Sequence, residues 1–482
     1  MSYPDALMYY ANTLRGVSTN VFRVNAMTTG DVGSSQTIRF ELPSNTLLNL
    51  RQTRLQFNAK CVGSAGDGNN QRLPPLHLLV NRVSVLAGGI PIDSGCNNLP
   101  VITEVLRQMR PDDCDPVDEH DAIYRQVSNS TYMDLSGSLE VGINTDGAGQ
   151  FNMSLGTFFD SVSPSILATD ILPSLQVEIF LSNNSVVLNP ISSVSNPLFA
   201  NEIIAGDQPT TLGATSTGSP DFQITNYHLV CPCVAIGDKG YEMMIDSAIS
   251  RGKYVPVLYH QYYNFSSTYT GDFIGSNGSE CLNKLIAVFR KNGYDAVGLA
   301  PWIRAGYTNE DGAITKRGDA QATYQVLQDG LYPTSEEYVH PQLLFEAPLT
   351  TALVSNANNT TNQVSSLPRL NWRVSNVMMP NYQVPLIEWY RLTKQAMDCS
   401  KPTKAKSQFE FMSTSFVVAQ ALNLPNTSVR LKCGADMRGS TSQIRLESNN
   451  TTNMKTNDNI EVFFQCTSEL RIGEGMQLQV FN

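Results

Sequence analysis

The residues of this sequence best suited to chemistry are acidic side chains clustered between residues 112 and 121. Carboxylates gathered over so short a stretch could hold a divalent cation, because such cations prefer hard oxygen ligands. Their spacing differs from that of an EF-hand loop, and two prolines, Pro111 and Pro116, break up the region. We therefore interpret it as a solvated acidic loop. The cluster contains Asp112, Asp113, Cys114, Asp115, Asp118, Glu119, His120 and Asp121.

The cysteines offer one pattern with metal-ligand spacing. Cys231 and Cys233 flank Pro232 and could form half of a zinc site. The sequence has no second Cys/His pair with ligand spacing, so we expect no bound metal. Nine cysteines are an odd number, and they are scattered over 482 residues. We therefore expect no disulfide framework and a reducing compartment.

The histidines do not belong to a catalytic motif. His228 and His260 lie within strand patterns, where a hydrogen-bonded structural role is expected. The sequence lacks a Gly-x-Ser-x-Gly elbow, a His-Glu-x-x-His pair and a Walker motif. We expect no catalytic residue, no cofactor and no enzyme activity, although distant carboxylates could still meet as an acid/base pair. The five histidines are His77, His120, His228, His260 and His340.

Five aromatic side chains of the second half could line a carbohydrate site. Aromatic rings also fill the cores of β-sandwiches and the contacts between subunits. We expect these rings to pack in a core or at a subunit interface. They are Tyr259, Tyr262, Tyr263, Trp372 and Trp389.

Length and composition describe a large chain with few charges. Its 482 residues exceed the size at which a single core stops growing, so two domains are expected. Charged residues make up 16% of the chain, and the net charge is −10. A nucleic-acid-coating protein should be basic, so we expect no direct sequence-specific nucleic-acid binding. The lysines at 401, 404 and 406 are interpreted as a solvated loop. We find no secretory signal at the N-terminus and no apolar run long enough to span a membrane.

Short alternating strand patterns fill both halves of the sequence. In the first half, residues 38–42, 55–61, 83–86, 151–155 and 175–181 alternate apolar and polar residues with a period of two. A helix is predicted over 98–109, with Asn97 or Asn98 as its N-cap and Pro100 in its first turn.

The second half repeats this organisation, and each half offers about eight strands. The sequence therefore predicts a mainly β protein with two consecutive eight-stranded antiparallel jelly-roll sandwiches, short helices and long loops. We place an N-terminal arm at 1–32, jelly rolls at 33–235 and 252–482, and a helical linker at 236–251. Long loops are expected at 183–220, 292–322 and 340–406, with residues 340–400 irregular.

The order of these patterns resembles that of the double jelly-roll major capsid proteins of virophages, polinton-like viruses and larger double-stranded DNA viruses. The resemblance covers nearly the whole chain, although no single motif is diagnostic. Segment 340–406 has no clear counterpart and is interpreted as a family-specific tower. The stretches that carry the resemblance are 38–43, 50–57, 83–89 with its Gly88-Gly89 turn, the helix at 98–109, Tyr332-Pro333, and 458–480.

The resemblance implies a structural protein of the virion. Members of this family form trimers whose six jelly rolls make a pseudo-hexameric capsomer, and capsomers tile an icosahedral shell. The expected partners are two further copies, neighbouring capsomers, penton and minor capsid proteins, and a host receptor met by tower loops. The towers are expected at 183–220, 292–322 and 340–406. Assembly inside the host cell is implied.

Two other functions stay open at this point. One is a two-domain β-sandwich that binds or cleaves carbohydrate, which the missing secretion signal and the scattered cysteines disfavour. The other is a penton or spike component of the same kind of virion. A penton protein usually has one jelly roll, so the two jelly rolls predicted here argue against a penton function.

Overall fold

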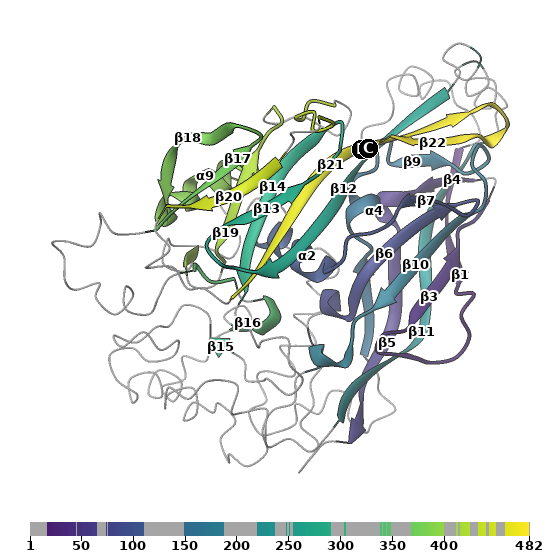
Figure 1. Ribbon diagram of the computed structural model, residues 1–482. Coiled ribbons are helices and arrows are strands. Elements are labelled where there is room, and N and C mark those ends of the chain that lie inside the picture. The colour runs from purple at the N-terminus through teal and green to yellow at the C-terminus, as the bar shows by residue number, and fades with distance from the viewer. Residues whose placement is uncertain are drawn as a thin grey trace.

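A computed structural model describes most of both halves of the chain. The two halves have separate pairs of antiparallel sheets, which lie side by side with the N-terminal half at the right of Figure 1 and the C-terminal half at the left. The described residues are 17–44, 46–64, 74, 76–109, 149–187, 219–236, 247, 250, 254–290, 303–304, 338–339, 341–343, 345–348, 368–399, 411–412, 415–424, 432–439, 443–449 and 458–481.

Eight principal strands form the N-terminal jelly roll. One sheet has the order β1-β11-β5-β8 and the other β3-β10-β6-β7, with all neighbours antiparallel. Counted along the chain, this is the order 1-8-3-6 facing 2-7-4-5, which two Greek keys produce. The strands are β1 (Val17–Asn25), β3 (Thr37–Glu41), β5 (Arg54–Ser64), β6 (Val80–Ala87), β7 (Ile90–Asp93), β8 (Gly149–Ser154), β10 (Leu175–Leu181) and β11 (Ser219–Ile236); short β2 (Val32–Gly33), β4 (Leu47–Asn49) and β9 (Ile166–Ala168) extend the first sheet.

The C-terminal half repeats the same strand order. Its sheets run β12-β21-β14-β19 and β13-β20-β17-β18, again 1-8-3-6 facing 2-7-4-5. The expected mainly β fold with two eight-stranded jelly rolls is thus confirmed. The strands are β12 (Tyr254–Thr268), β13 (Phe273–Ser276), β14 (Leu282–Arg290), β17 (Arg369–Val374), β18 (Val377–Pro385), β19 (Val417–Ala421), β20 (Gln443–Ser448) and β21 (Asn459–Gly473); β22 (Leu478–Phe481) pairs with β21, and β15 (Ile303–Arg304) with β16 (Tyr338–Val339).

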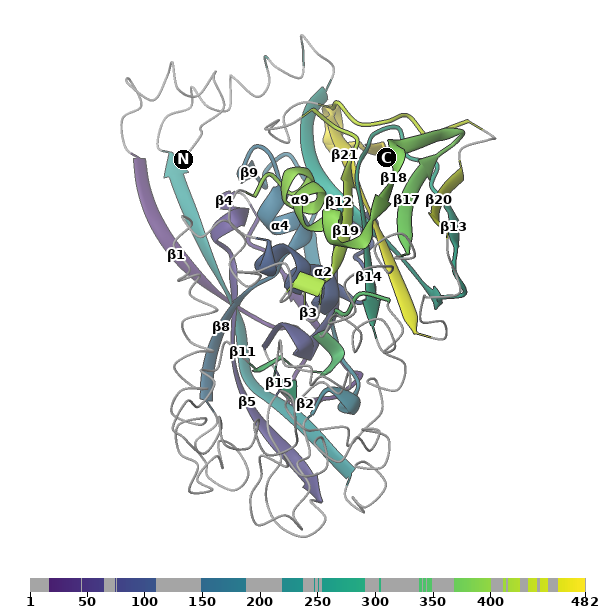
Figure 2. The same cartoon turned by 90° about the vertical axis from the view of Figure 1, so that its left-hand side faces the viewer.

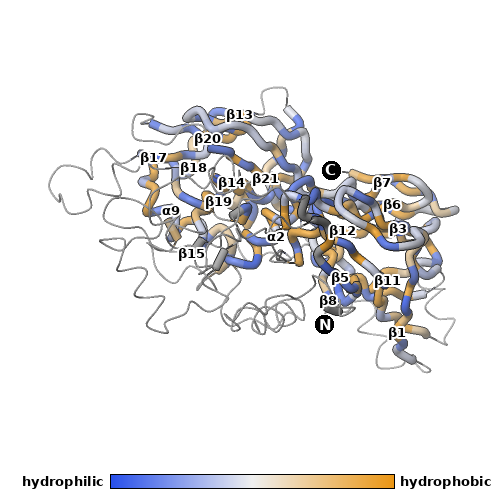
Figure 3. Tube along the Cα trace, turned by 90° about the horizontal axis from the view of Figure 1, so that it is seen from below, coloured by the Kyte–Doolittle hydropathy of each residue, from blue (hydrophilic) through white to orange (hydrophobic). Residues whose placement is uncertain are grey.

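Alternation of apolar and polar side chains explains why these segments are strands. Along β10, for example, every second residue from Leu175 to Leu181 is buried, because one face of the strand packs on the facing sheet. Figure 3 shows the resulting mixture of apolar and polar residues along the strands. Strand β21 instead carries a nearly continuous buried run, since it lies inside its sheet between β12 and β14.

Each jelly roll has a helix between its fifth and sixth strands. In the first roll this is α2 (Leu99–Gln108), which begins after Asn98 and has Pro100 in its first turn, as the sequence predicts. In the second roll it is α9 (Trp389–Ala396). Within the described ranges, the further helical elements are α4 (Thr157–Ser161) and the 3-10 turns η1 (Leu50–Gln52), η2 (Leu76–Leu79), η3 (Asn184–Val186), η7 (Pro341–Leu343), η8 (Leu386–Glu388) and η10 (Glu474–Met476). Among the described residues, no helix has the length and apolar character that a membrane span requires.

Three expectations from the sequence need correction. Part of the expected arm, residues 1–32, is the strand β1, which pairs with β11 over its whole length. Residues 369–396 of the segment expected to be irregular form β17, β18 and α9. The prolines of this segment wrongly indicated irregular structure, because β18 is an edge strand, where proline is tolerated. The apolar run from Phe409 to Val418 also predicts a strand from the sequence, and that strand begins only at Val417. Most of the expected linker at 236–251 lies outside the described residues.

Candidate functional site

The cysteine pair that could bind zinc is buried in β11. Cys231 and Cys233 lie two residues apart on one face of the strand, and both side chains pack in the core. Burial raises the pKa of the Cys231 thiol to about 12 and raises the pKa of Cys233 as well. Neutral buried thiols are poor ligands and nucleophiles. No cluster of three potential metal-ligating side chains occurs among the described residues, and residues 112–121 lie outside them.

The two histidines expected to be structural have hydrogen-bonding neighbours in the sheets. His228 Nε2 lies 3.0 Å from Gln56 Oε1. His260 Nδ1 lies 3.5 Å from Asn283 Nδ2 and 3.4 Å from Thr467 Oγ1. Burial lowers the pKa of both histidines, with that of His260 reduced to about 4. Both are therefore neutral near pH 7, in keeping with a structural role.

The aromatic residues do not form an exposed carbohydrate platform. Trp372 and Trp389 are buried in the C-terminal roll, and Trp389 Nε1 donates to the carbonyl oxygen of Leu370 at 3.3 Å. Tyr262 is also buried, and its hydroxyl accepts a hydrogen bond from Gln465 Nε2 at 2.6 Å. These rings therefore contribute packing within the roll.

Tyr263 is half-buried, and its hydroxyl donates to Gln261 Oε1 at 3.1 Å. The remaining aromatic residue, Tyr259, makes a specific contact between the two jelly rolls. The ring of Tyr259 on β12 packs edge-on against Phe158 of α4, with centroids 5.0 Å apart. The Tyr259 hydroxyl donates to the carbonyl oxygen of Ile92, at the end of β7, at 2.5 Å. Both rings are essentially inaccessible to solvent. One side of the contact therefore comes from β12 and the other from β7 and α4.

Main-chain hydrogen bonds reinforce this inter-roll contact. The N–H of Ser163 donates to the carbonyl oxygen of Leu258 at 2.7 Å, and the N–H of Leu258 donates back at 3.0 Å. The N–H of His260 donates to Ser161 Oγ at 2.9 Å. Three consecutive residues of β12 are thus bound to the N-terminal roll, which fixes both the register and the distance between the rolls.

A buried carboxyl group lies beside the same contact. Asp93 follows Ile92 and accepts a hydrogen bond from the N–H of Gly95 at 2.9 Å. Burial raises the pKa of Asp93 to about 6, and the hydrogen bond only partly opposes this. Burial, with a smaller contribution from the nearby Asp93 charge, raises the pKa of the Tyr259 hydroxyl, which stays protonated and able to donate.

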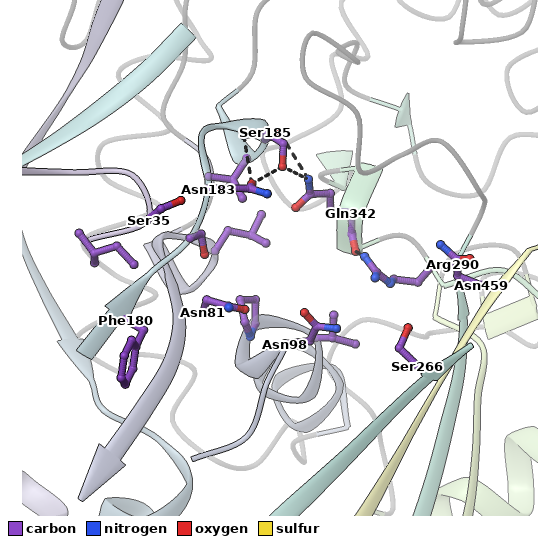
Figure 4. Close-up of a pocket in the computed structure, with 16 residues that line it drawn as sticks. Ser35, Asn81, Asn98, Phe180, Asn183, Ser185, Ser266, Arg290, Gln342 and Asn459 are labelled. Atoms are coloured by element: carbon purple, nitrogen blue, oxygen red, sulfur yellow. Dashed lines mark hydrogen bonds between the residues drawn. The ribbon is translucent and has the colours of Figure 1, made fainter. Parts of the chain in front are cut away.

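A polar cavity of about 540 Å3 separates the rolls farther along the interface (Figure 4). Gln342 Nε2 reaches across it to the carbonyl oxygen of Ser185 at 3.3 Å. Arg290 lines its C-terminal side and forms a buried ion pair with Glu461. The pair neutralises both charges, so the cavity offers mainly amide and hydroxyl groups. The labelled lining residues are Ser35, Asn81, Asn98, Phe180, Asn183, Ser185, Ser266, Arg290, Gln342 and Asn459.

Large apolar side chains are exposed on the outer side of each roll. Val21 and Phe22 on β1 are 60% and 40% exposed. On the other roll, Ile387 after β18 is 47% exposed and Leu424 after β19 is 59% exposed. In Figure 1, β1 and the pair β18 and α9 stand on opposite sides of the molecule. Single exposed apolar side chains are common on folded proteins, so these four do not by themselves define a contact site.

Comparison with known proteins gives a consistent picture at the level of fold. No family model and no curated protein matches the sequence. Solved structures do match, at low identity. The PBCV-1 virus capsid matches with a TM-score of 0.53 and 12% identity, over 97% of each chain. The Faustovirus major capsid protein matches with a TM-score of 0.52 and 9% identity, over 95% of this chain and 91% of that one.

These matches extend over both halves, and both proteins are double jelly-roll major capsid proteins. The chain is a double jelly roll. The residues that join the two halves of this double jelly roll were not evident from the sequence, which singled out Tyr259 only as one of five aromatic residues of a packed core or a subunit interface. Phe158 and Ile92 show only ordinary apolar patterning, because their role depends on what the fold places opposite them.

Proposed function

We propose that the chain is a structural major capsid protein that trimerises into pseudo-hexameric capsomers and tiles an icosahedral shell. The observation that carries the proposal is the rigid pairing of two jelly rolls with the same strand order. Two such rolls per chain give six similar units per trimer, which suits a hexagonal lattice. The low charge content fits, since uncharged surface is less costly to desolvate at subunit contacts.

The distribution of long connections supports an orientation for the subunit. In an antiparallel jelly roll, the connections 3–4, 5–6 and 7–8 all lie at one end. The longest connections of both rolls belong to this set: β7 to β8, β10 to β11, and β14 to β17. Of the tower segments proposed from the sequence, 183–220 and 292–322 fall mainly in these connections, whereas 340–406 also includes the strands β17 and β18. We place this end on the outside of the shell, where tower loops could meet a host receptor.

Neighbouring capsomers, penton proteins and minor capsid proteins are the proposed further partners, and the virion is the proposed location. The opposite end of each roll, with tighter connections such as the Gly88-Gly89 turn, would then face inward. The remaining part of the arm, residues 1–16, is proposed to lie at that inner side. No catalytic residue, metal or cofactor is part of the proposal.

The test is the mass and shape of the purified chain in solution. Light scattering should give three times the 52.9 kDa of one chain, and electron microscopy should show particles with a hexagonal outline or shells built from them. A monomer at every accessible concentration would refute self-assembly. Binding of that monomer to a glycan array would then favour the carbohydrate-binding alternative.

A further inference from the structure

Segment 432–437 is held against the residues that lead into β14, in the C-terminal roll. The N–H of Leu282 donates to the carbonyl oxygen of Ala435 at 2.9 Å, and the N–H of Ala435 donates back at 2.8 Å. The N–H of Met437 donates to the carbonyl oxygen of Ser279 at 2.9 Å. These main-chain bonds fix the position of the segment beside the start of the strand.

Ion pairs fix the other end of segment 432–437. Lys432 Nζ lies 2.9 Å from Glu469 Oε2 on β21 and 3.6 Å from Glu280 Oε2. β21 and β19 pair with the two edges of β14, and Figure 2 shows the three strands together in the C-terminal roll. Cys433 follows Lys432 and therefore lies in an anchored part of the chain.

The anchored segment brings Cys433 close to the thiol of Cys281. The N–H of Gly434 donates to Cys281 Sγ at 3.1 Å, and this thiol donates to Asn283 Oδ1 at 3.3 Å. Bond lengths put the Cα atom of Cys433 about 2.4 Å from the Gly434 nitrogen, on the side of its N–H, so a straight hydrogen bond places that Cα about 4 Å from Cys281 Sγ. This distance suits a disulfide, whose Cβ atoms are about 3.8 Å apart.

Gly434 permits this close approach. A Cβ atom at Gly434 would lie 2.4 Å from the carbonyl oxygen of Leu282 and 2.7 Å from Asn283 Oδ1. Both separations are below 3.0 Å, which real Cβ atoms essentially never show. A larger residue at this position would therefore push the segment, and Cys433 with it, away from β14.

The thiols of this region differ in their access to solvent. Cys433 is partly exposed, whereas Cys281 is 3% exposed. Cys466 on β21 is a further thiol near Cys281, but it is fully buried, and burial raises its pKa to about 11. A buried, protonated thiol reacts slowly with disulfides. A dissolved disulfide therefore reaches Cys433 first, and Cys281 is placed to react next.

We propose that Cys433 and Cys281 form an internal disulfide when the protein leaves a reducing compartment and meets a small-molecule disulfide such as oxidised glutathione. The Cys433 thiolate attacks one sulfur of that molecule, and one glutathione thiol leaves. The Cys281 sulfur then attacks the Cys433 sulfur, forming the bond between the two cysteines and releasing the second glutathione thiol. Two protons and two electrons pass from the protein thiols to the two glutathione molecules.

The bond would join two connections at one end of the C-terminal roll. Cys281 lies between its second and third strands, β13 and β14, and Cys433 lies between its sixth and seventh strands, β19 and β20. The closed loop contains β17, β18 and α9, so the bond limits the freedom of the unfolded chain and stabilises the roll. These connections lie at the end opposite the proposed towers. The inference does not depend on the trimer.

Disulfide mapping of the wild-type chain tests the proposal. Protein kept in reductant and protein incubated with oxidised glutathione are alkylated, digested and analysed by mass spectrometry without reduction. We expect the peptides of Cys281 and Cys433 to be linked only after oxidation. The melting temperature should then rise by about 5 °C or more. Cys433→Ser should abolish both changes, and it should fold normally because this side chain is partly exposed.

A glycine variant tests the positioning of the two thiols. Gly434→Ala should slow formation of the bond by about tenfold or more, because it displaces Cys433 from Cys281. Iodoacetamide should still modify Cys433 in the reduced variant at least as fast as in the wild type. The matched control is Gly278→Ala, since nothing lies within 4 Å of a Cβ atom at Gly278 and the bond should form at the wild-type rate.

Three results would overturn the inference. The first is an oxidised wild type in which the Cys281 and Cys433 peptides are not linked, including one that links Cys433 to another cysteine or to a second copy. The second is a bond that forms equally fast in Gly434→Ala and Gly278→Ala. The third is a bond that forms without raising the melting temperature, which would refute its stabilising role. All three leave the proposed function standing, because light scattering measures assembly separately.

Discussion

The hydroxyl of Tyr259 donates a hydrogen bond of 2.5 Å to the carbonyl oxygen of Ile92, joining the first strand of one jelly roll to the fifth strand of the other. The ring of the same tyrosine packs on Phe158. One side chain therefore supplies both a directional bond and apolar burial. This combination holds the rolls in one orientation, where apolar packing alone would tolerate sliding.

Tyr259→Phe should lower the free energy of unfolding by about 1 to 3 kcal/mol, because the buried Ile92 carbonyl loses its donor while the ring packing is kept. Urea denaturation measures the change. The matched control is Tyr254→Phe, whose partly exposed ring lies against Arg471 within the C-terminal roll. Equal effects of the two substitutions would contradict a special role for the Tyr259 hydroxyl.

Glu461→Gln should destabilise the chain by about 3 to 5 kcal/mol, because it removes the carboxylate that forms an ion pair with the buried Arg290. The exposed pair Arg391 and Glu388 provides the comparison, and Glu388→Gln should cost less than about 1 kcal/mol. The double variant Arg290→Met with Glu461→Leu should recover much of the loss. A single variant as stable as the wild type would show that the pair is not buried.

Asp93 should make the protein less stable as the pH rises from about 4 to about 6. Its pKa is raised from 3.8 to about 6, so the folded state binds the proton more tightly than the unfolded state, and this advantage disappears once the group ionises. Two pKa units correspond to at most about 3 kcal/mol. Asp93→Asn keeps the acceptor for the Gly95 N–H and should gain stability over the wild type as the pH increases through this range. If the difference in stability between Asp93→Asn and the wild type did not change with pH, the raised pKa of Asp93 would be rejected.

His260 should act in the opposite direction. Burial is the main reason that its folded-state pKa lies near 4, below the usual 6.5, so the folded state binds the proton more weakly. Stability from this group is present above pH 6.5 and is lost as the pH falls toward 4. His260→Asn should therefore lose less stability on acidification than the wild type does. The reverse order, measured by denaturation at pH 7 and pH 4.5, would show that His260 is charged in the fold.

Cys231 and Cys233 should resist alkylation in the native protein, because burial keeps both thiols protonated and inaccessible. Iodoacetamide labelling followed by mass spectrometry should modify the partly exposed Cys433 much faster. Labelling in urea serves as the control, since all three should then react alike. Rapid native labelling of Cys231 would place it on the surface.

The alternating apolar pattern by itself determined the two-roll architecture. Ile38 and Phe40, for example, face the core because a period of two puts them on one side of a strand. The same local information predicted α2 from its spacing and from Pro100. It failed at β1 and β18, because an edge strand needs less apolar alternation and β18 contains prolines.

Only the tertiary structure decided how the two rolls meet. The local sequence did not show that Tyr259 is buried against Phe158, whereas Val21 on β1 is exposed. Their environments differ because contacts between distant segments depend on the packing of whole sheets, and this information is spread over many residues. For the same reason, the inter-roll contact became visible only in the folded molecule.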